Sequence, residues 1–204
     1  MKLDFKRKTI NLRHGIVKLI APKLYVDMTN IGNLIAATPR PMTLFLKEHF
    51  RADEFVGLEI GTAKGDNALS ILQELPIKKL FLIDPYTSYV ERGQQVSFEE
   101  TFTIARKKLS QFHQVIFMKK TSENAVKDVD EPLDFVYIDG NHSYEYVKND
   151  IALYYPLVKA GGVVGGHDYV PYHDAGVFQA VNEFVQERSR MHFYAVFPDW
   201  WVVK

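Results

Sequence analysis

The sequence predicts an α/β fold in which a doubly wound, mostly parallel seven-stranded sheet ends in a C-terminal antiparallel hairpin. Three observations predict this fold. Short apolar runs alternate with stretches of helical spacing from about residue 55 to the end of the 204-residue chain. A glycine turn from Gly61 to Gly65 joins the first apolar run to the helix that follows it. Polar side chains end the runs, at the sheet edge where ligands bind in folds of this class.

Seven short segments have the apolar composition of strands. The first five alternate with helices, which argues for parallel pairing through right-handed crossovers, with helices on both faces of the sheet. The last two are joined by Pro198 and Asp199 alone, so they are expected to pair as an antiparallel hairpin at one edge. The predicted strands are Val56–Ile60, Lys79–Asp84, Val115–Met118, Leu133–Ile138, Gly162–Gly165, Phe193–Phe197 and Trp200–Val203.

A helix is predicted after each of the first five strands. In the second of them, Phe98, Phe102 and Ala105 recur at the spacing of one helix face. Ser122 is expected to be the N-cap of the third, because its hydroxyl can accept a bond from a free amide of the first turn. The predicted helices are Asp66–Glu74, Phe98–Phe112, Ser122–Val129, Tyr144–Val158 and Gly176–Arg188.

The chain is predicted to have two parts. Residues 1–52 are expected to form an irregular, mostly helical extension that Pro39 and Pro41 interrupt, with a helix from Met42 to Phe50 leading to the first strand. Residues 53–204 form the domain with the alternating pattern. The extension begins with a basic segment, which leaves open a weak association with a membrane surface, although a solvated helix is favoured.

Composition excludes several classes of function. Hydrophobic residues make up 47% of the chain, enough for a packed core. Lysine plus arginine equals aspartate plus glutamate at 25 each, so the overall charge gives no argument for nucleic-acid binding. Cysteine is absent, which excludes disulfides, thiolate nucleophiles and cysteine-ligated zinc and fits a cytoplasmic protein. No apolar run has the length of a membrane span. The sequence leaves open a homo-oligomer.

Two acidic residues at the tips of adjacent strands predict a nucleoside pocket beside the glycine turn. Gly61 and Gly65 allow a ligand to approach the backbone closely, and the helix after Gly65 presents unpaired amides. Asp84 could accept bonds from both ribose hydroxyls, since a carboxylate has two oxygens. Both acidic residues could instead have purely structural roles. Glu59 could be an ordinary carboxylate at a strand end, and Asp84 could start a turn at Pro85.

The spacing of the glycines distinguishes between two kinds of nucleoside cofactor. A dinucleotide fingerprint needs three glycines, whereas the turn here has two. An acid-x-Gly-x-x-x-Gly pattern is instead typical of enzymes that use S-adenosylmethionine. Glu59 is then expected to bind the methionine ammonium, and Ser122 to contact the adenine edge or to serve only as a helix cap. The predicted cofactor-binding residues are Glu59, Gly61, Thr62, Gly65, Asp84, Ser122 and Asp139.

From about residue 55 to residue 204 the chain resembles the class I S-adenosylmethionine-dependent methyltransferases. Within them it is most similar to the group of macrolide-sugar O-methyltransferases and related tailoring enzymes. The segments that support the resemblance are GLEIGTAKGDNALSIL, FLIDPY, LDFVYIDGNHSYEYVKNDI, KAGGVVGGHDY and GVFQAVNEF. The resemblance implies a Rossmann-like methyltransferase fold with a seven-stranded sheet and a C-terminal antiparallel hairpin.

Polar residues after the fourth and fifth strands predict the catalytic end of the site. A histidine titrates near neutral pH, so His142 is a candidate general base for a hydroxyl. Asp139 and Asp168 offer the oxygen ligands that Mg²⁺ prefers, and a divalent cation could hold a diol. In the resembled family the D-G-x-H motif provides one metal ligand and the base, here Asp139 and His142.

The family's second pair of ligands is acidic or amide, and here it is His167 and Asp168. Imidazole suits zinc, copper, iron or nickel better than magnesium, so the presence and identity of a metal at Asp139, His167 and Asp168 stay open. Asp139 could instead cap the turn at Gly140, and His142 could be a hydrogen-bonding loop residue.

The sequence therefore predicts an S-adenosylmethionine-dependent O-methyltransferase acting on a small hydroxylated acceptor, such as a sugar or a natural product, with or without a divalent cation such as Mg²⁺. The alternatives are a nicotinamide-dependent oxidoreductase, against which the missing third glycine counts, and a non-catalytic S-adenosylmethionine-binding protein. The candidate acceptor contacts are Tyr144, Tyr169, Tyr172, His173 and Asp174.

Overall fold

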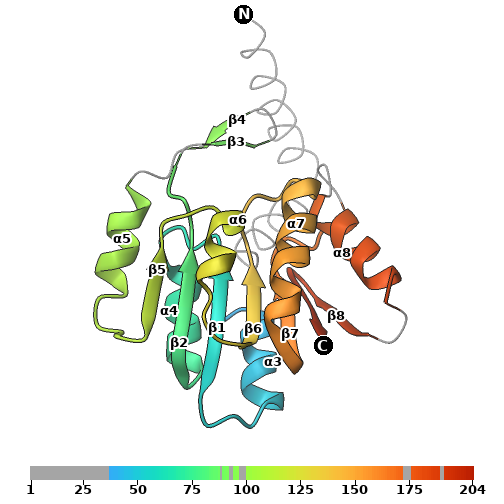
Figure 1. Ribbon diagram of the computed structural model, residues 1–204, viewed down its shortest axis with the longest axis horizontal. Helices are drawn as coiled ribbons and strands as arrows, with labels where there is room; N and C mark the ends of the chain where they lie inside the picture. The colour runs from blue at the N-terminus through green and yellow to red at the C-terminus, as the bar shows by residue number, and fades with distance from the viewer. Residues whose placement is uncertain (1–36, 88, 92–93, 97–99, 172–175, 189–190) are drawn as a thin grey trace, which may run out of the picture. The chain divides into compact units, whose positions relative to one another are not determined.

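A seven-stranded sheet with helices on both faces forms the centre of the molecule (Figure 1). The computed structural model describes residues 37–87, 89–91, 94–96, 100–171, 176–188 and 191–204. The compact unit that contains the sheet runs from Thr38 to Lys204. Its strands are β1 (Phe55–Ile60), β2 (Ile77–Ile83), β5 (Val115–Met118), β6 (Leu133–Ile138), β7 (Val158–Gly166), β8 (His192–Val196) and β9 (Asp199–Val203).

The strand order is β5-β2-β1-β6-β7-β9-β8. The five strands from β5 to β7 pair in parallel, whereas β9 is antiparallel to β7 and β8 is antiparallel to β9. The predicted fold class, including the C-terminal hairpin at the edge, is therefore confirmed. The carboxyl ends of β1, β2 and β6 meet where the order reverses around β1, which is where sheets of this class bind ligands.

The helices are α3 (Pro41–His49), α4 (Asp66–Glu74), α5 (Thr101–Lys108), α6 (Ser122–Ala125), α7 (Tyr144–Tyr154) and α8 (Gly176–Gln186), with 3₁₀ turns at Val126–Asp128 and Tyr155–Leu157. They belong to two hydrophobic cores separated by the sheet. Ile151 of α7 and Val181 of α8 pack in one core, and Leu46 of α3 and Ile71 of α4 pack in the other. Successive residues of a strand point to opposite faces, so both cores draw on the same strands.

Several details differ from the sequence-based expectations. Strand β7 has nine residues and begins at Val158, where a helix was predicted to end, whereas the predicted strand was only Gly162–Gly165. Thr121, with an extended backbone, is the N-cap of α6, and Ser122 is already the first helical residue, so the prediction that Ser122 is the cap was wrong. A two-stranded antiparallel sheet, β3 (Tyr89–Glu91) and β4 (Gln94–Val96), lies between β2 and α5 and was not predicted. Across the described ranges, no helix combines the length and hydropathy that crossing a membrane requires.

Candidate functional site

The glycine turn after β1 brings the backbones of two strand ends into contact. Gly61 has a φ of +88°, and its amide donates to the carbonyl of Ile83 at 2.8 Å. A Cβ at Gly61 would lie 1.9 Å from the carbonyl oxygen of Asp139. Only glycine fits so close an approach at a positive φ. Gly61 therefore joins the turn after β1 to the segment after β6.

Replacing Gly61 with alanine is expected to destabilise the protein much more than the same change at Gly161. Gly161 also has a positive φ, +80°, but no described atom lies within 4 Å of the position its Cβ would take. Gly161→Ala should cost only the backbone strain of about 1–2 kcal/mol. Gly61→Ala adds the overlap with Asp139. Urea unfolding of both variants measures the difference, and equal losses would contradict the packing argument.

Asp84 follows β2 directly and binds two backbone amides, one of them in the glycine turn. Its Oδ2 accepts a hydrogen bond from the amide of Ala63 at 2.9 Å, and its Oδ1 accepts one from the amide of Tyr86 at 2.7 Å. Burial raises the pKa of Asp84, and these two hydrogen bonds partly offset that effect. Each oxygen keeps a further lone pair for a ligand hydroxyl.

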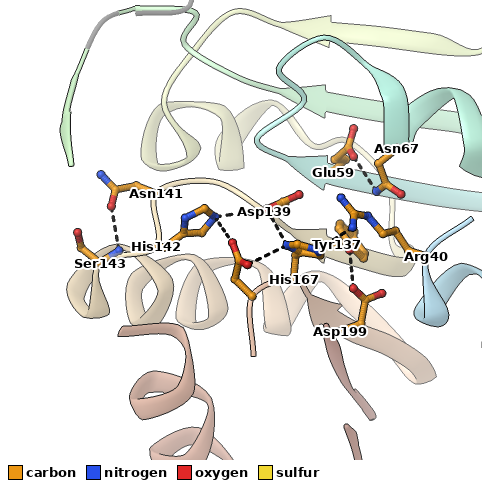
Figure 2. A network of polar contacts seen from close by, with 11 residues as sticks. Arg40, Glu59, Asn67, Tyr137, Asp139, Asn141, His142, Ser143, His167 and Asp199 are labelled. Atoms are coloured by element: carbon orange, nitrogen blue, oxygen red, sulfur yellow. Dashed lines mark hydrogen bonds and ion pairs between the residues drawn. The ribbon is translucent and has the colours of Figure 1, made fainter. Parts of the chain in front are cut away.

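Glu59 is buried on β1 with 1% of its surface exposed. Its Oε1 accepts a hydrogen bond from Nδ2 of Asn67 at 2.9 Å (Figure 2), and among the described residues its Oε2 has no hydrogen-bond partner. Burial raises the pKa of Glu59 to about 8, an effect that the negative charges of Asp139 and Asp84 reinforce. A buried carboxyl with one unsatisfied oxygen fits a cationic or hydrogen-bond-donating partner.

A cleft opens to solvent at this edge of the sheet. Of the predicted cofactor residues, Gly61, Asp84, Ser122 and Asp139 line the cleft, whereas Glu59, Thr62 and Gly65 are not among its lining residues. The lining residues are Ile60, Gly61, Ala63, Ile83, Asp84, Pro85, Thr87, Thr121, Ser122, Asp139, Gly140, Asn141, Tyr146 and Asp150.

Two lining residues on α7 were missed by the sequence analysis. Tyr146 and Asp150 are four residues apart and so lie on one face of the helix. The signal that could have identified them is this four-residue spacing on the helix that follows β6 and Asp139. Burial raises the pKa of Asp150 to about 6, and a hydrogen bond with Ser122 opposes that effect.

Two aspartates and a histidine meet at the ends of β6 and β7. Nε2 of His142 lies 3.4 Å from Oδ1 of Asp139 and 3.1 Å from Oδ2 of Asp168. These three residues each offer a donor atom within 4.8 Å of the others, a spacing that could hold a metal ion. The predicted set of Asp139, His167 and Asp168 is also brought together, since Nδ1 of His167 lies 3.3 Å from Oδ1 of Asp168 and 3.7 Å from Oδ1 of Asp139. His142 joins the same cluster.

His167 is buried beside this cluster and contacts Arg40 (Figure 2). Burial acts against a charged His167 ring, but Asp168 and the charge of Asp139 outweigh it and raise the pKa of His167, while Arg40 lowers it. Burial likewise acts to raise the pKa of Asp168, but the contact with His167 and the charges of His142 and Arg40 lower it overall. Arg40 was not predicted as a site residue.

Asp199, the first residue of β9, is fully buried next to the site and anchors α3. Its Oδ2 accepts from the amide of Met42 at 3.1 Å, and its Oδ1 accepts from the hydroxyl of Tyr137 at 2.9 Å. Burial raises the pKa of Asp199 from 3.8 to about 6, against these hydrogen bonds and the charges of His167 and Arg40. Ionisation of Asp199 therefore costs stability in the folded protein.

Asp199→Asn is expected to become more stable relative to the native chain as the pH rises. Because the folded pKa of Asp199 is raised, its contribution is most favourable below the unfolded pKa near 4 and is lost as the pH rises through about 6. A change from 3.8 to about 6 corresponds to about 3 kcal/mol. Urea unfolding at both ends of this pH window measures the difference. The exposed Asp130→Asn is the control, and parallel pH profiles for the native chain and Asp199→Asn would contradict the prediction.

Two of the candidate acceptor contacts lie within the described residues. The hydroxyl of Tyr144 donates to Oε2 of Glu183, and the hydroxyl of Tyr169 donates to Oδ1 of Asn182 at 3.1 Å, so both tyrosines contact α8. Tyr172, His173 and Asp174 lie outside the described residues.

Comparison with known proteins identifies the family of this chain. A family model described as a methyltransferase domain matches residues 58–169, more than half of the chain. An uncharacterized protein of Acanthamoeba polyphaga mimivirus is 30% identical over 152 residues. That match covers 70% of this chain and 64% of the relative, so it spans slightly less than two thirds of the relative's length.

Solved structures of methyltransferases share the fold. An O-methyltransferase from Bacillus cereus, in complex with S-adenosylhomocysteine, is 16% identical with a TM-score of 0.59, covering 95% of this chain and 97% of that one. The O-methyltransferase TomG from Streptomyces achromogenes, in complex with S-adenosylmethionine, is 18% identical with a TM-score of 0.56, covering 80% and 78%. An rRNA methylase from Streptococcus thermophilus is 18% identical with a TM-score of 0.58, covering 81% and 96%.

Proposed function

This chain belongs to the methyltransferase-domain family, within the class I S-adenosylmethionine-dependent methyltransferases, and from that premise we propose that it methylates a hydroxyl group of a small acceptor such as a sugar or a natural product. The observation that carries the proposal is the meeting of Asp139, His142 and Asp168 beside the cleft at the carboxyl ends of β1, β2 and β6. Family membership removes the nicotinamide-dependent oxidoreductase from consideration. The O-methyltransferases among the similar structures support a hydroxyl acceptor.

The residues of the cleft fit an adenosyl donor. Asp84 can bind the ribose hydroxyls, and Ser122 lines the same cleft at the start of α6, where it can reach the base. Glu59, with its unsatisfied oxygen, is a candidate for the ammonium group, since a nearby cation would favour its ionised form. When bound, S-adenosylmethionine supplies an electrophilic methyl group on a sulfonium.

In the reaction, the residues of this chain orient the acceptor and remove its proton. The carboxylates of Asp139 and Asp168 stabilise a proton on Nε2 of His142, so Nδ1 is the basic nitrogen of the neutral ring. His142 would accept the hydroxyl proton as the methyl group passes to the acceptor oxygen, with the sulfur–methyl bond broken and S-adenosylhomocysteine as the leaving group. The charged ring is then stabilised by the two carboxylates.

Binding of a divalent cation is a second role for the same three residues. Carboxylates suit Mg²⁺ and Mn²⁺, and imidazole suits Zn²⁺, Fe²⁺ or Ni²⁺, so the mixed set fits several ions. A bound cation would polarise acceptor oxygens. Because Nε2 of His142 is then a ligand, the metal-dependent and metal-free forms of the proposal differ in the part that His142 plays.

Transfer of a radiolabelled methyl group from S-adenosylmethionine to a panel of sugars and hydroxylated natural products tests the proposal. Labelled product is expected with at least one acceptor. Chelation followed by addition of Mg²⁺, Mn²⁺ or Zn²⁺ then separates the two forms, because only the metal-dependent form loses turnover and regains it. Binding of S-adenosylmethionine without transfer to any acceptor of the panel would favour the non-catalytic alternative.

A further inference from the structure

A buried arginine reaches the acidic cluster from outside the segment that matches the family model. Arg40 is the N-cap residue of α3, and 9% of its surface is exposed. Its Nη1 lies 2.7 Å from Nε2 of His167, which is 127 residues further along the chain (Figure 2). The family model matches from residue 58 onward, so this contact is supplied by a part of the chain that the model does not include.

The chemistry of the two groups determines where the proton of His167 lies. A guanidinium has donors and no acceptor, and arginine stays protonated in proteins. The imidazole nitrogen that contacts it must therefore present a lone pair, so Nε2 of His167 carries no proton. The neutral ring then holds its proton on Nδ1. That nitrogen lies 3.3 Å from Oδ1 of Asp168 and 3.7 Å from Oδ1 of Asp139.

We propose that Arg40 is a positioning residue that holds His167 as the Nδ1–H tautomer, so that this ring donates toward Asp168 and keeps its carboxylate beside His142. The carboxylates favour a proton on the side of the ring that faces them, and Arg40 requires a lone pair on the other side. A ring with its single proton on Nδ1 satisfies both neighbours. His167 then acts on the cluster through Asp168 and is not a metal ligand, since both of its nitrogens are engaged.

The position of α3 supports a fixed role for Arg40. Asp199 accepts a hydrogen bond from the amide of Met42, two residues after Arg40, and is itself bound by Tyr137 of β6. The charge of Arg40 also acts on Glu59 and Asp199, where it partly offsets the rise in pKa that burial causes in each carboxyl. Arg40 is thus a buried cation near acidic groups of two strands, Glu59 of β1 and Asp199 of β9.

Nitrogen-15 NMR of the free protein tests the tautomer directly, at a pH above the raised pKa of His167. Protein labelled at its histidine ring nitrogens gives long-range proton–nitrogen correlations that distinguish a protonated nitrogen from one with a lone pair. His167→Gln identifies the signals of His167. We expect a protonated Nδ1 and an unprotonated Nε2. A protonated Nε2, in either the other neutral tautomer or the doubly protonated ring, would overturn the proposal.

Three variants test the part played by Arg40. Arg40→Lys keeps a donor and should keep the Nδ1–H pattern, whereas Arg40→Met removes the group that requires a lone pair on Nε2 and should move the signals toward the doubly protonated ring. Lys47→Met removes an exposed charge from the same helix, where Lys47 pairs with Glu74, and should leave the spectrum unchanged. A folded Arg40→Met protein with the native pattern would overturn the proposal.

The spectrum of the native chain decides the tautomer without any variant, and Arg40→Lys tests the donor if Arg40→Met does not fold. The experiment needs neither S-adenosylmethionine nor an acceptor. A failure of the proposed methyl transfer is therefore distinguishable from a failure of this inference.

Discussion

Asp84→Ala is expected to weaken the binding of S-adenosylmethionine by about 100-fold or more. The carboxylate lines the cleft, and each of its oxygens has a lone pair beyond the one that binds a backbone amide. A hydrogen bond to a charged group contributes about 1.5–3 kcal/mol, so the loss of two bonds to the ribose amounts to about 3 kcal/mol or more. Every 1.4 kcal/mol is about a tenfold change in affinity. Isothermal titration calorimetry measures the effect.

Two controls separate this loss from a change in the fold. Asp66→Ala removes an exposed carboxylate from the first turn of α4, where it pairs with Lys108, and should leave the affinity unchanged. Asp84→Asn keeps the shape of the side chain and one acceptor, so its affinity should lie between those of the native chain and Asp84→Ala. Thermal unfolding must accompany both, because the amides of Ala63 and Tyr86 lose their acceptor in Asp84→Ala. Unchanged affinity in a folded Asp84→Ala protein would remove Asp84 from the cofactor site.

The fold was predictable because its signals are local. An apolar run of five or six residues, a glycine turn and a helical repeat each lie within a short window, and the parallel order follows from their alternation. The exact ends of the helices and strands were harder to predict from the sequence. Helix α7 gives way to a 3₁₀ turn at Tyr155–Leu157, where Pro156 removes a backbone donor. The β3–β4 pair was missed because its strands are only three residues long and contain glutamine and glutamate.

The candidate site was only partly predictable, because some of its contacts join residues far apart in sequence. Asp84, Asp139 and Asp168 could be identified since each follows a strand whose carboxyl end lies at the ligand-binding edge. Arg40 had no such signal. It stands alone between two prolines, and its partner is 127 residues away. The choice between His142 and His167 also depended on which way each ring turns, and neighbouring sequence does not determine that.

His142→Gln is expected to lower the rate of methyl transfer by about 10²–10⁴-fold while leaving the affinity for S-adenosylmethionine unchanged. A positioned general base contributes about that factor, and His142 is not among the residues that line the cleft. His113→Gln, at an exposed position in the loop before β5, is the matched control and should retain full turnover. The measurement is single-turnover transfer to an acceptor found in the panel. Full activity in His142→Gln would remove His142 from the reaction.

A second measurement on the same variant separates the two parts that His142 could play. If His142 is the base, turnover of His142→Gln should rise with pH, because hydroxide replaces the missing proton acceptor, and binding of Mn²⁺ should match that of the native chain. If Nε2 of His142 is a ligand, the variant should lose Mn²⁺ affinity together with activity, since one of three donors is gone. Asp168→Asn should weaken Mn²⁺ binding only in the second case. The spacing of the cluster permits both arrangements, and the carboxylates of Asp139 and Asp168 lie beside Nε2 of His142 in each. A cation therefore takes the position of the proton that Nε2 carries in the metal-free form, whereas the proton of the acceptor goes to Nδ1.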